Sequence, residues 1–311
     1  MHVHLVTIAL LAARETTRRQ YNGMPIANLC LLCSGSHRPF RYHQERRDNP
    51  GNHMEPAGGF ATYPSLRGRV VIVTGGATGI GESIVEAFAR QSAQVTFLDI
   101  QDGAAELLIK RLASDGATSP VYYRCDLTDV AQVQRTVQSV LERFHTVDVL
   151  VNNAGNDTRH TVAEVTSESW DRAIAVNLKH QFFMSQAVIP AMQKAHRGSI
   201  INMSSIGWVI PSTRQVVYVT SKAGIVGMTR TLAHELGADN IRVNCILPGA
   251  IQTERQQRLW LTDEYKAEVL ANQALKRMIL PEEVARLALF LASDDSSAIT
   301  NQSYVIDAGW V

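Results

Sequence analysis

The sequence predicts an α/β fold, a doubly wound, seven-stranded parallel sheet with helices on both faces in a single domain. Two observations lead to this expectation. From Arg67 onward, short β-branched runs alternate with longer helical stretches, which is the pattern of repeated βαβ units. A glycine-rich segment, TGGATGIG at 74–81, also stands between the first strand and the first helix. Sheets of this kind, the Rossmann type, bind nucleotides at that point.

The strands and helices follow from this alternation in chain order. Val and Ile dominate the strand candidates, which suits strands buried on both faces. Strands are expected at 70–74, 94–99, 121–125, 147–151, 199–203, 242–247 and 303–306. Helices are expected near 80–91, 102–114, 129–144, 167–196, 215–237 and 281–293. No internal repeat or Pro-rich linker follows Arg67, so residues 67–311 are predicted to form one domain.

Residues 1–66 lack the alternation and are expected to be a disordered extension, or to reflect a start codon assigned upstream of Met54. The apolar run at 5–13 resembles the core of a signal peptide. However, no Lys or Arg precedes it and no small-residue cleavage site follows it. Cys30 and Cys33 form a lone CxxC pair without a second pair of ligands, so no metal site is expected.

The composition narrows the classes of partner. Lys and Arg total 30 against 29 Asp and Glu, a formal net charge of +1, which does not favour nucleic acid. No apolar run is long enough to span a bilayer, so no membrane partner is expected. The four cysteines are too few and too scattered for a disulfide framework. We therefore expect a cytoplasmic protein with a small-molecule substrate.

The glycine-rich segment predicts a dinucleotide site. Gly75 allows the tight turn, Gly79 lets the backbone approach a pyrophosphate, and Gly81 lets the helix pack close to the sheet. A structural strand-to-helix turn is the alternative reading. Asp99, at the end of the second strand, favours the functional one, because a carboxylate there accepts hydrogen bonds from the adenosine ribose and repels a 2′-phosphate. The expected cofactor is therefore NAD rather than NADP.

Tyr218 and Lys222 are the candidate catalytic pair. They lie at positions i and i+4 of a predicted helix and so share one face. The lysine charge favours the phenolate and lowers the tyrosine pKa toward the range useful for a general base. Such pairs are also common on helix surfaces. Ser205, at the end of the fifth strand, and Asn177, in the preceding helix, make the catalytic interpretation stronger.

These motifs resemble those of the short-chain dehydrogenase/reductase family in order and spacing. Besides TGGATGIG they include CDL at 125–127, NNAG at 152–155, AVNL at 175–178 and PGAIQT at 248–253. The resemblance implies that Tyr218 is the acid/base, that Lys222 lowers its pKa and binds the nicotinamide ribose, and that Ser205 holds the substrate oxygen. Asn177 would support a proton-relay water. One departure is Asn301, where the family usually has Gly, which puts a local turn in doubt.

The same resemblance supplies the rest of the cofactor site. Asp126 would contact the adenine, residues 153–155 the adenosine side, and Thr253 the carboxamide. The full expected set is Gly75, Thr78, Gly79, Ile80, Gly81, Asp99, Asp126, Leu127, Asn153, Ala154, Gly155, Tyr218, Lys222, Pro248, Gly249, Ile251 and Thr253.

The loops after the strand ends are polar and contain tryptophan, which suits a polyhydroxylated ligand. Each hydroxyl of a sugar needs a partner, and sugar C–H faces stack on indole rings. The expected substrate contacts are Asn156, His160, Ser205, Trp208 and Tyr218. These segments resemble the NAD-dependent aldose 1-dehydrogenases of the family, which implies oxidation of the anomeric carbon of a D-xylose-like aldose to the lactone. A purely structural role is the alternative for three residues of these loops. Arg159 would then be a surface charge, His160 a hydrogen-bonded structural histidine, and Trp260 a cap on a helix or a subunit contact.

Two other functions stay open. The core motifs equally permit a 3-oxoacyl or other carbonyl reductase, although Asp99 favours NAD, and such reductases usually use NADPH. A catalytically inactive NAD-binding subunit is the alternative of another class. The long helices at 167–196 and 215–237 resemble those with which the family pairs subunits, so a homotetramer is expected.

Overall fold

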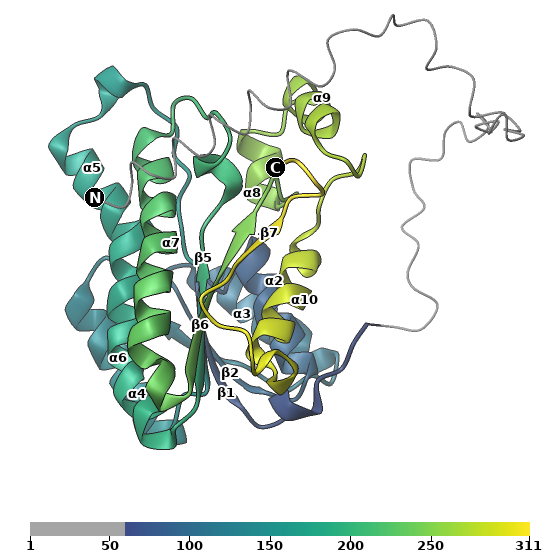
Figure 1. Ribbon diagram of the computed structural model, residues 1–311. Coiled ribbons are helices and arrows are strands. Elements are labelled where there is room, and N and C mark those ends of the chain that lie inside the picture. Colours follow the sequence, from purple (N-terminus) through teal and green to yellow (C-terminus); the bar gives the residue numbers. More distant parts are fainter. Residues whose placement is uncertain (1–59) are drawn as a thin grey trace, which may run out of the picture. The chain divides into compact units, whose positions relative to one another are not determined.

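The computed structural model describes residues 60–311 (Figure 1). Of the extension predicted for residues 1–66, residues 1–59 lie outside the described part, as do the signal-like run and Cys30 with Cys33. Within the described part, Leu66 of the short helix η2 (Pro64–Leu66) is 1% exposed in the core. The backbone amide of Tyr63 donates to the side chain of Gln91. The packed domain therefore includes residues ahead of Arg67, because Leu66 fills core volume beside the first helix.

The sheet has seven parallel strands in the order β3-β2-β1-β4-β5-β6-β7, which confirms the predicted fold class. The order reverses between β1 and β4, and ligands of such sheets bind in the crevice outside the carboxyl ends of the strands at that switch. The strands are β1 (Val70–Thr74), β2 (Gln94–Asp99), β3 (Val121–Arg124), β4 (Val149–Asn152), β5 (Gly198–Met203), β6 (Ile241–Pro248) and β7 (Ser303–Ile306).

Helices cover both faces of the sheet (Figure 1). Alternate residues of β1 point to opposite faces. Val71 and Val73 pack with α2 (Gly79–Arg90), α3 (Asp102–Ser114) and α10 (Pro281–Ala292). Ile72 packs on the other face with α4 (Val130–Phe144), α6 (His180–Ala195) and α7 (Val216–Leu236). The five central strands are thus buried on both sides, which explains their content of Val and Ile, whereas the edge strands β3 and β7 are only partly buried.

The expected helix at 167–196 is divided in three. It consists of α5 (Ser167–Ile174), a π-helical turn η4 (Ala175–Lys179) and α6. Asn177 sits in the π-turn with its side chain fully buried. Such turns insert one extra residue into a helix and occur often at functional sites, and here the turn brings Asn177 to the switch-point crevice.

Two short helices follow β6 that the sequence pattern did not predict, α8 (Glu254–Leu259) and α9 (Asp263–Asn272). Thr253 caps α8 and Thr262 caps α9, each accepting a hydrogen bond from a backbone amide of the first turn. Asn301 stands where the resembling family usually has Gly, and it adopts a left-handed backbone conformation with φ of 61°. Asn tolerates this conformation better than most residues, so the turn is kept without glycine.

Within residues 60–311 no helix has the length and apolarity needed to cross a bilayer.

Candidate active site

A cavity of about 810 Å³ opens at the carboxyl ends of the strands. It runs from the glycine-rich loop past the ends of β4 and β5 to the helices α8 and α9. Its wall contains every expected cofactor residue, and also Asn156, Ser205, Tyr218 and Lys222. The fold therefore gathers residues that lie far apart in the sequence into one space.

The glycine-rich loop is built for close packing. A Cβ atom on Gly81 would lie 1.8 Å from the carbonyl oxygen of Gly75, and one on Gly75 would lie 2.9 Å from the Cα atom of Ala154. Gly75 and Gly79 also have positive φ angles of 64° and 62°, which glycine adopts without strain. The first turn of α2 thus faces the cavity with free backbone N–H groups, so the loop fits the pyrophosphate of a dinucleotide.

The NNAG segment holds this loop in place. The side-chain amide of Asn153 donates to the carbonyls of Thr74 and Gly75, at 3.0 and 3.1 Å. The hydroxyl of Thr74 accepts from the backbone amides of Asn153 and Ala154. Asn153 and Ala154 therefore position the loop as well as lining the cavity.

Asp99 stands at the end of β2 with 7% of its surface exposed. Its carboxylate accepts backbone hydrogen bonds from Ala77, Ile100 and Gln101, at 3.0, 2.7 and 3.1 Å. These bonds fix the carboxylate at the cavity wall beside the glycine-rich loop. Gln101 also lines the cavity, and its side-chain amide lies 3.4 Å from both Asp99 and Thr78. It is an additional polar group beside Asp99 that the motifs did not indicate.

The loop after β6 forms the wall of the cavity that faces the glycine-rich loop. Gly249 packs against Asp307, where a Cβ atom would lie 2.8 Å from the Asp307 Cβ. A Cβ atom on Gly79 would lie 3.3 Å from the Cγ2 atom of Thr253. The two loops that the sequence assigns to the cofactor thus approach each other across the cavity. Asp126 also lines the cavity, and its carboxylate accepts from the amide and hydroxyl of Thr128.

Tyr218 and Lys222 lie on the cavity side of α7. The Lys222 Nζ atom is 5.5 Å from the centre of the Tyr218 ring and donates to the carbonyl of Met203 at 2.8 Å. Burial lowers the pKa of Lys222 to about 8. Burial also raises the pKa of Tyr218 to about 12, and its hydrogen bond with Ser205 offsets part of this rise. The structure therefore raises the pKa of Tyr218, whereas the sequence predicts that the charge of Lys222 lowers it.

Asn177 lies just behind the cavity wall and clasps the loop that carries Asn156. Its side-chain oxygen accepts from the Asn156 amide at 2.8 Å, and its side-chain nitrogen donates to the Asn156 carbonyl at 3.0 Å. Asn177 is fully buried. Its visible contribution is to fix the loop that enters the substrate end of the cavity.

The substrate end is strongly polar. The Asp157 carboxylate accepts from Arg255 at 3.2 Å and from the side-chain amide of Gln256 at 2.7 Å, which ties α8 to the loop after β4. The Arg159 guanidinium lies 4.5 Å from the centre of the Trp260 ring and 5.5 Å from that of Tyr265. Five of these side chains line the cavity, namely Asp157, Arg159, Arg255, Gln256 and Tyr265.

Comparison with known proteins shows to which family the chain belongs. A family model described as Enoyl-(Acyl carrier protein) reductase matches residues 75–311. The D-xylose 1-dehydrogenase of Caulobacter vibrioides is 50% identical over 250 residues, covering 80% of this chain and 98% of that protein. The chain belongs to the short-chain dehydrogenase/reductase family. It is accordingly an oxidoreductase acting on CH–OH groups, and members of this family use a nicotinamide cofactor.

Two further relatives of the family agree with this assignment. A protein of Rhizobium meliloti (strain 1021) described as "Probable galactose dehydrogenase GalD" is 48% identical over 247 residues, covering 79% of this chain and 96% of that protein. The crystal structure of gox2181 matches with a TM-score of 0.75 at 32% identity, covering 79% of this chain and 98% of that one.

Two residues expected to contact substrate do not line the cavity of this family member. His160 is held by a backbone hydrogen bond from its amide to the Arg214 carbonyl. Trp208 lies in the short helix η5 (Ile206–Trp208) and is 37% exposed. Tyr265 and Trp310 line the cavity instead. Tyr265 comes from a helix that the sequence pattern did not predict. Trp310 is brought in because the buried Asp307 accepts hydrogen bonds from the amides of Gly309 and Val311.

Proposed function

We propose that the protein is an NAD-dependent aldose 1-dehydrogenase, which oxidises the anomeric carbon of a D-xylose-like aldose to the lactone. The observation that carries the proposal is the polar wall formed by Asp157, Arg159, Arg255 and Gln256 at the Tyr218 end of the cavity. Sugar hydroxyls need hydrogen-bond partners in a desolvated site, and these side chains offer donors and acceptors that an apolar acyl chain would not use. The two sugar dehydrogenases among the relatives support the same substrate class.

The reaction follows from the positions of Tyr218, Ser205 and Lys222. Ser205, hydrogen-bonded to Tyr218, holds the C1 oxygen of the cyclic sugar. The Tyr218 phenolate takes the C1 hydroxyl proton as the C1 hydrogen departs with its bonding electrons, and C1 becomes the lactone carbonyl. The nicotinamide ring, when bound, accepts that hydride. The Lys222 charge favours the phenolate and its ammonium binds the nicotinamide ribose, while Asn177 supports the water that carries the proton away.

Asp99 supports NAD over NADP. Its carboxylate is fixed by three backbone N–H groups next to the glycine-rich loop. A ribose 2′-hydroxyl can donate to it, whereas a 2′-phosphate would be repelled by it. The remaining cofactor contacts are assigned to the cavity-lining residues of the glycine-rich loop, the NNAG segment and the loop that ends at Thr253.

Two alternatives make different predictions. A 3-oxoacyl or other carbonyl reductase is favoured by a relative from Thermotoga maritima described as "3-oxoacyl-[acyl-carrier-protein] reductase FabG", which is 40% identical over 247 residues, but such an enzyme would prefer NADPH and an apolar substrate channel. An inactive NAD-binding subunit would bind the cofactor without turnover, yet Asn177, Ser205, Tyr218 and Lys222 are all present.

We also assign the protein to the cytoplasm as a homotetramer. The two cysteines of the described region, Cys125 and Cys245, are buried free thiols, which suits a reducing compartment. Phe182 on α6 and Val216 on α7 are 41% and 42% exposed. Exposed apolar side chains on these long helices suit subunit contacts, and size-exclusion chromatography with light scattering tests the assembly.

The direct test is a substrate panel. The purified full-length chain is assayed for cofactor reduction with aldopentoses, aldohexoses and 6-deoxysugars, with NAD and NADP in parallel. We expect NAD-linked oxidation of one or two aldoses and a lactone product. Reduction of a 3-oxoacyl substrate with NADPH, combined with no activity on any sugar, would favour the reductase. NAD binding without turnover of either class would favour the inactive subunit.

A further inference from the structure

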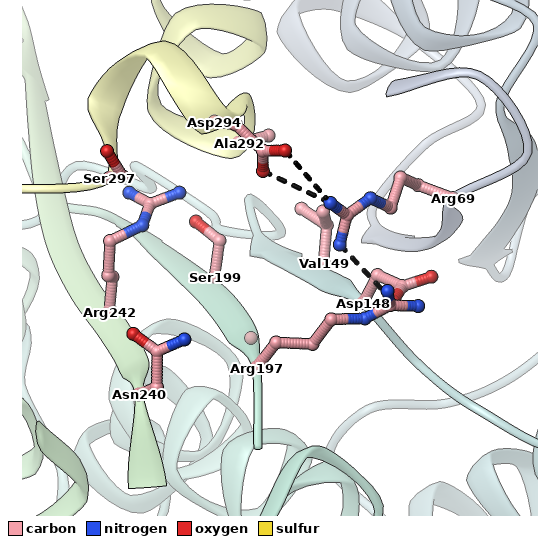
Figure 2. Close-up of a pocket in the computed structure, with 11 residues that line it drawn as sticks. Arg69, Asp148, Val149, Arg197, Ser199, Asn240, Arg242, Ala292, Asp294 and Ser297 are labelled. Atoms are coloured by element: carbon pink, nitrogen blue, oxygen red, sulfur yellow. Dashed lines mark hydrogen bonds and ion pairs between the residues drawn. The ribbon is translucent and has the colours of Figure 1, made fainter. Parts of the chain in front are cut away.

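A second cavity, of about 220 Å³, lies at the opposite ends of the strands from the active site. Arg69 immediately precedes β1, Arg197 precedes β5, and Arg242 is the second residue of β6. Asp294 and Ser297 come from the chain that follows α10. Figure 2 shows Arg69 and Arg242 extending toward the same space from opposite sides. Three guanidinium groups thus surround one polar cavity.

Two carboxylates neutralise only part of this charge. Asp148, whose side chain is 3% exposed, lies 2.7 Å from Arg197 and 3.7 Å from Arg69, and it also accepts from the Val70 amide. Asp294 pairs with Arg69 at 3.1 Å, but its side chain is 67% exposed, so water weakens that pair. The cavity wall therefore carries three positive and two negative side chains.

Arg242 is the cation that lacks a carboxylate. Its guanidinium donates to the carbonyls of Ile299 and Ser293, at 3.3 and 3.2 Å. Among the salt bridges of residues 60–311 it has no acidic partner within 4.0 Å. Burial lowers the pKa of Arg242, the like charge of Arg69 lowers it further, and Asp294 opposes both. A half-buried guanidinium held near a second one by neutral carbonyls is stabilised by an anion placed between them.

We propose that this cavity binds a phosphate-type oxyanion between Arg242, Arg69 and Arg197. Guanidinium groups present planar forks of N–H donors that match phosphate oxygens, and the exposed Ser297 hydroxyl on the rim adds a further donor. The anion would join the amino ends of β1, β5 and β6 to the segment after α10, so its binding stabilises the fold. This site is independent of the proposed sugar oxidation.

Two substitutions should change binding in opposite directions. Ser297→Glu places a carboxylate beside the arginines, so the affinity of this cavity for phosphate should fall at least tenfold while stability without phosphate is kept. Asp294→Asn removes a competing carboxylate, so phosphate should bind about threefold more tightly. Ser114→Glu, an exposed serine at the end of α3, is the matched control. A purely structural arginine cluster would not produce these opposite shifts.

The measurement is thermal unfolding of the full-length chain in a phosphate-free buffer, titrated with inorganic phosphate or with chloride at matched ionic strength. We expect a saturable rise in Tm with phosphate that chloride does not produce. This rise should shrink in Ser297→Glu to the part that the glycine-rich loop contributes, and it should be retained in full in Ser114→Glu. The glycine-rich loop can also take phosphate, but that contribution is the same in all variants. A parallel titration with glycerol phosphate shows whether the site accepts a free anion only or also a phosphoryl group. Equal responses to phosphate and chloride, or an unchanged response in Ser297→Glu, would overturn the proposal.

Discussion

Single residues of the active site owe their positions to backbone hydrogen bonds that the motifs encode. Asp99 is held by three amides, Asn153 by two carbonyls, and Asn177 by both polar atoms of the Asn156 backbone. The placement of Asp99 and Asn153 could be predicted because these residues lie at strand ends, where the spacing of the motifs fixes their contacts. The contact of Asn177 depends instead on the π-turn η4. Tyr265 and Trp310 could not be predicted, since they reach the cavity through loops whose course depends on tertiary packing.

Replacing Tyr218 with Phe tests the acid/base role. Removal of the phenolic oxygen should lower kcat by about 10²–10⁴-fold, the range of general acid–base catalysis, because the substitution removes the group to which we assign the C1 proton. NAD affinity, measured by quenching of protein fluorescence, should change little. Substantial residual turnover would show that another base acts.

Asp99→Asn tests the origin of cofactor choice. Loss of the negative charge should reduce the NAD/NADP ratio of kcat/KM by about tenfold, equivalent to about 1.4 kcal/mol, because the 2′-phosphate is no longer repelled. Asp102→Asn, which alters an exposed carboxylate on the neighbouring helix, should leave the ratio unchanged. An identical ratio in the Asp99 variant and the wild type would remove the ribose role.

At the level of elements, the sheet was predictable because each buried strand carries a continuous β-branched run between turn signals. The helix expected at 167–196 was not, because its interruption at η4 depends on the contact of Asn177 with a distant loop. Helices α8 and α9 are short, with few buried residues, so the sequence shows little apolar periodicity there. These two helices nevertheless close the substrate end of the cavity.

The tie between α8 and the loop after β4 leads to a prediction for substrate affinity. Asp157→Asn weakens the hydrogen bonds to Arg255 and Gln256. The sugar KM should rise about threefold, as expected for loss of a partly exposed ion pair, with a smaller effect on kcat. Steady-state kinetics measure both, and Asp171→Asn on the exposed side of α5 is the control. A changed kcat at constant KM would instead place Asp157 in the chemical step.

For the whole molecule, one buried histidine makes stability depend on pH. His180 is fully buried, and burial together with the charge of Lys222 lowers its pKa to about 3. Below pH 6.5 the unfolded chain binds a proton that the folded chain does not, so stability falls as the pH decreases from 6.5 toward 3. Between pH 6.5 and 5 the loss from this group should be about 2 kcal/mol.

Urea unfolding at the two pH values measures this effect. The His180→Leu variant should lose less stability on acidification than the wild type, since Leu takes up no proton in either state. His234→Gln, on the exposed surface of α7, should behave as the wild type does. Equal acid sensitivity in all three proteins would mean that His180 is not the responsible group.

The molecule as a whole keeps its two cavities at opposite ends of one parallel sheet. The carboxyl ends carry the residues that we propose bind cofactor and substrate, at the place where the switch in strand order leads one to expect a ligand. The amino ends carry the arginine cluster, which no motif indicated, because its members are isolated in sequence and meet only when the strands align. The sequence therefore predicts the catalytic end much better than the opposite one.

The measurement that tests the central claim most directly is hydride tracing with aldoses deuterated at C1. D-Xylose and D-galactose labelled at that position are incubated with NAD and the full-length chain, and the reduced cofactor is analysed by mass spectrometry. Oxidation at the anomeric carbon predicts one deuterium in each reduced cofactor and a lactone product. Unlabelled reduced cofactor, or no reduction with either sugar, would contradict the account.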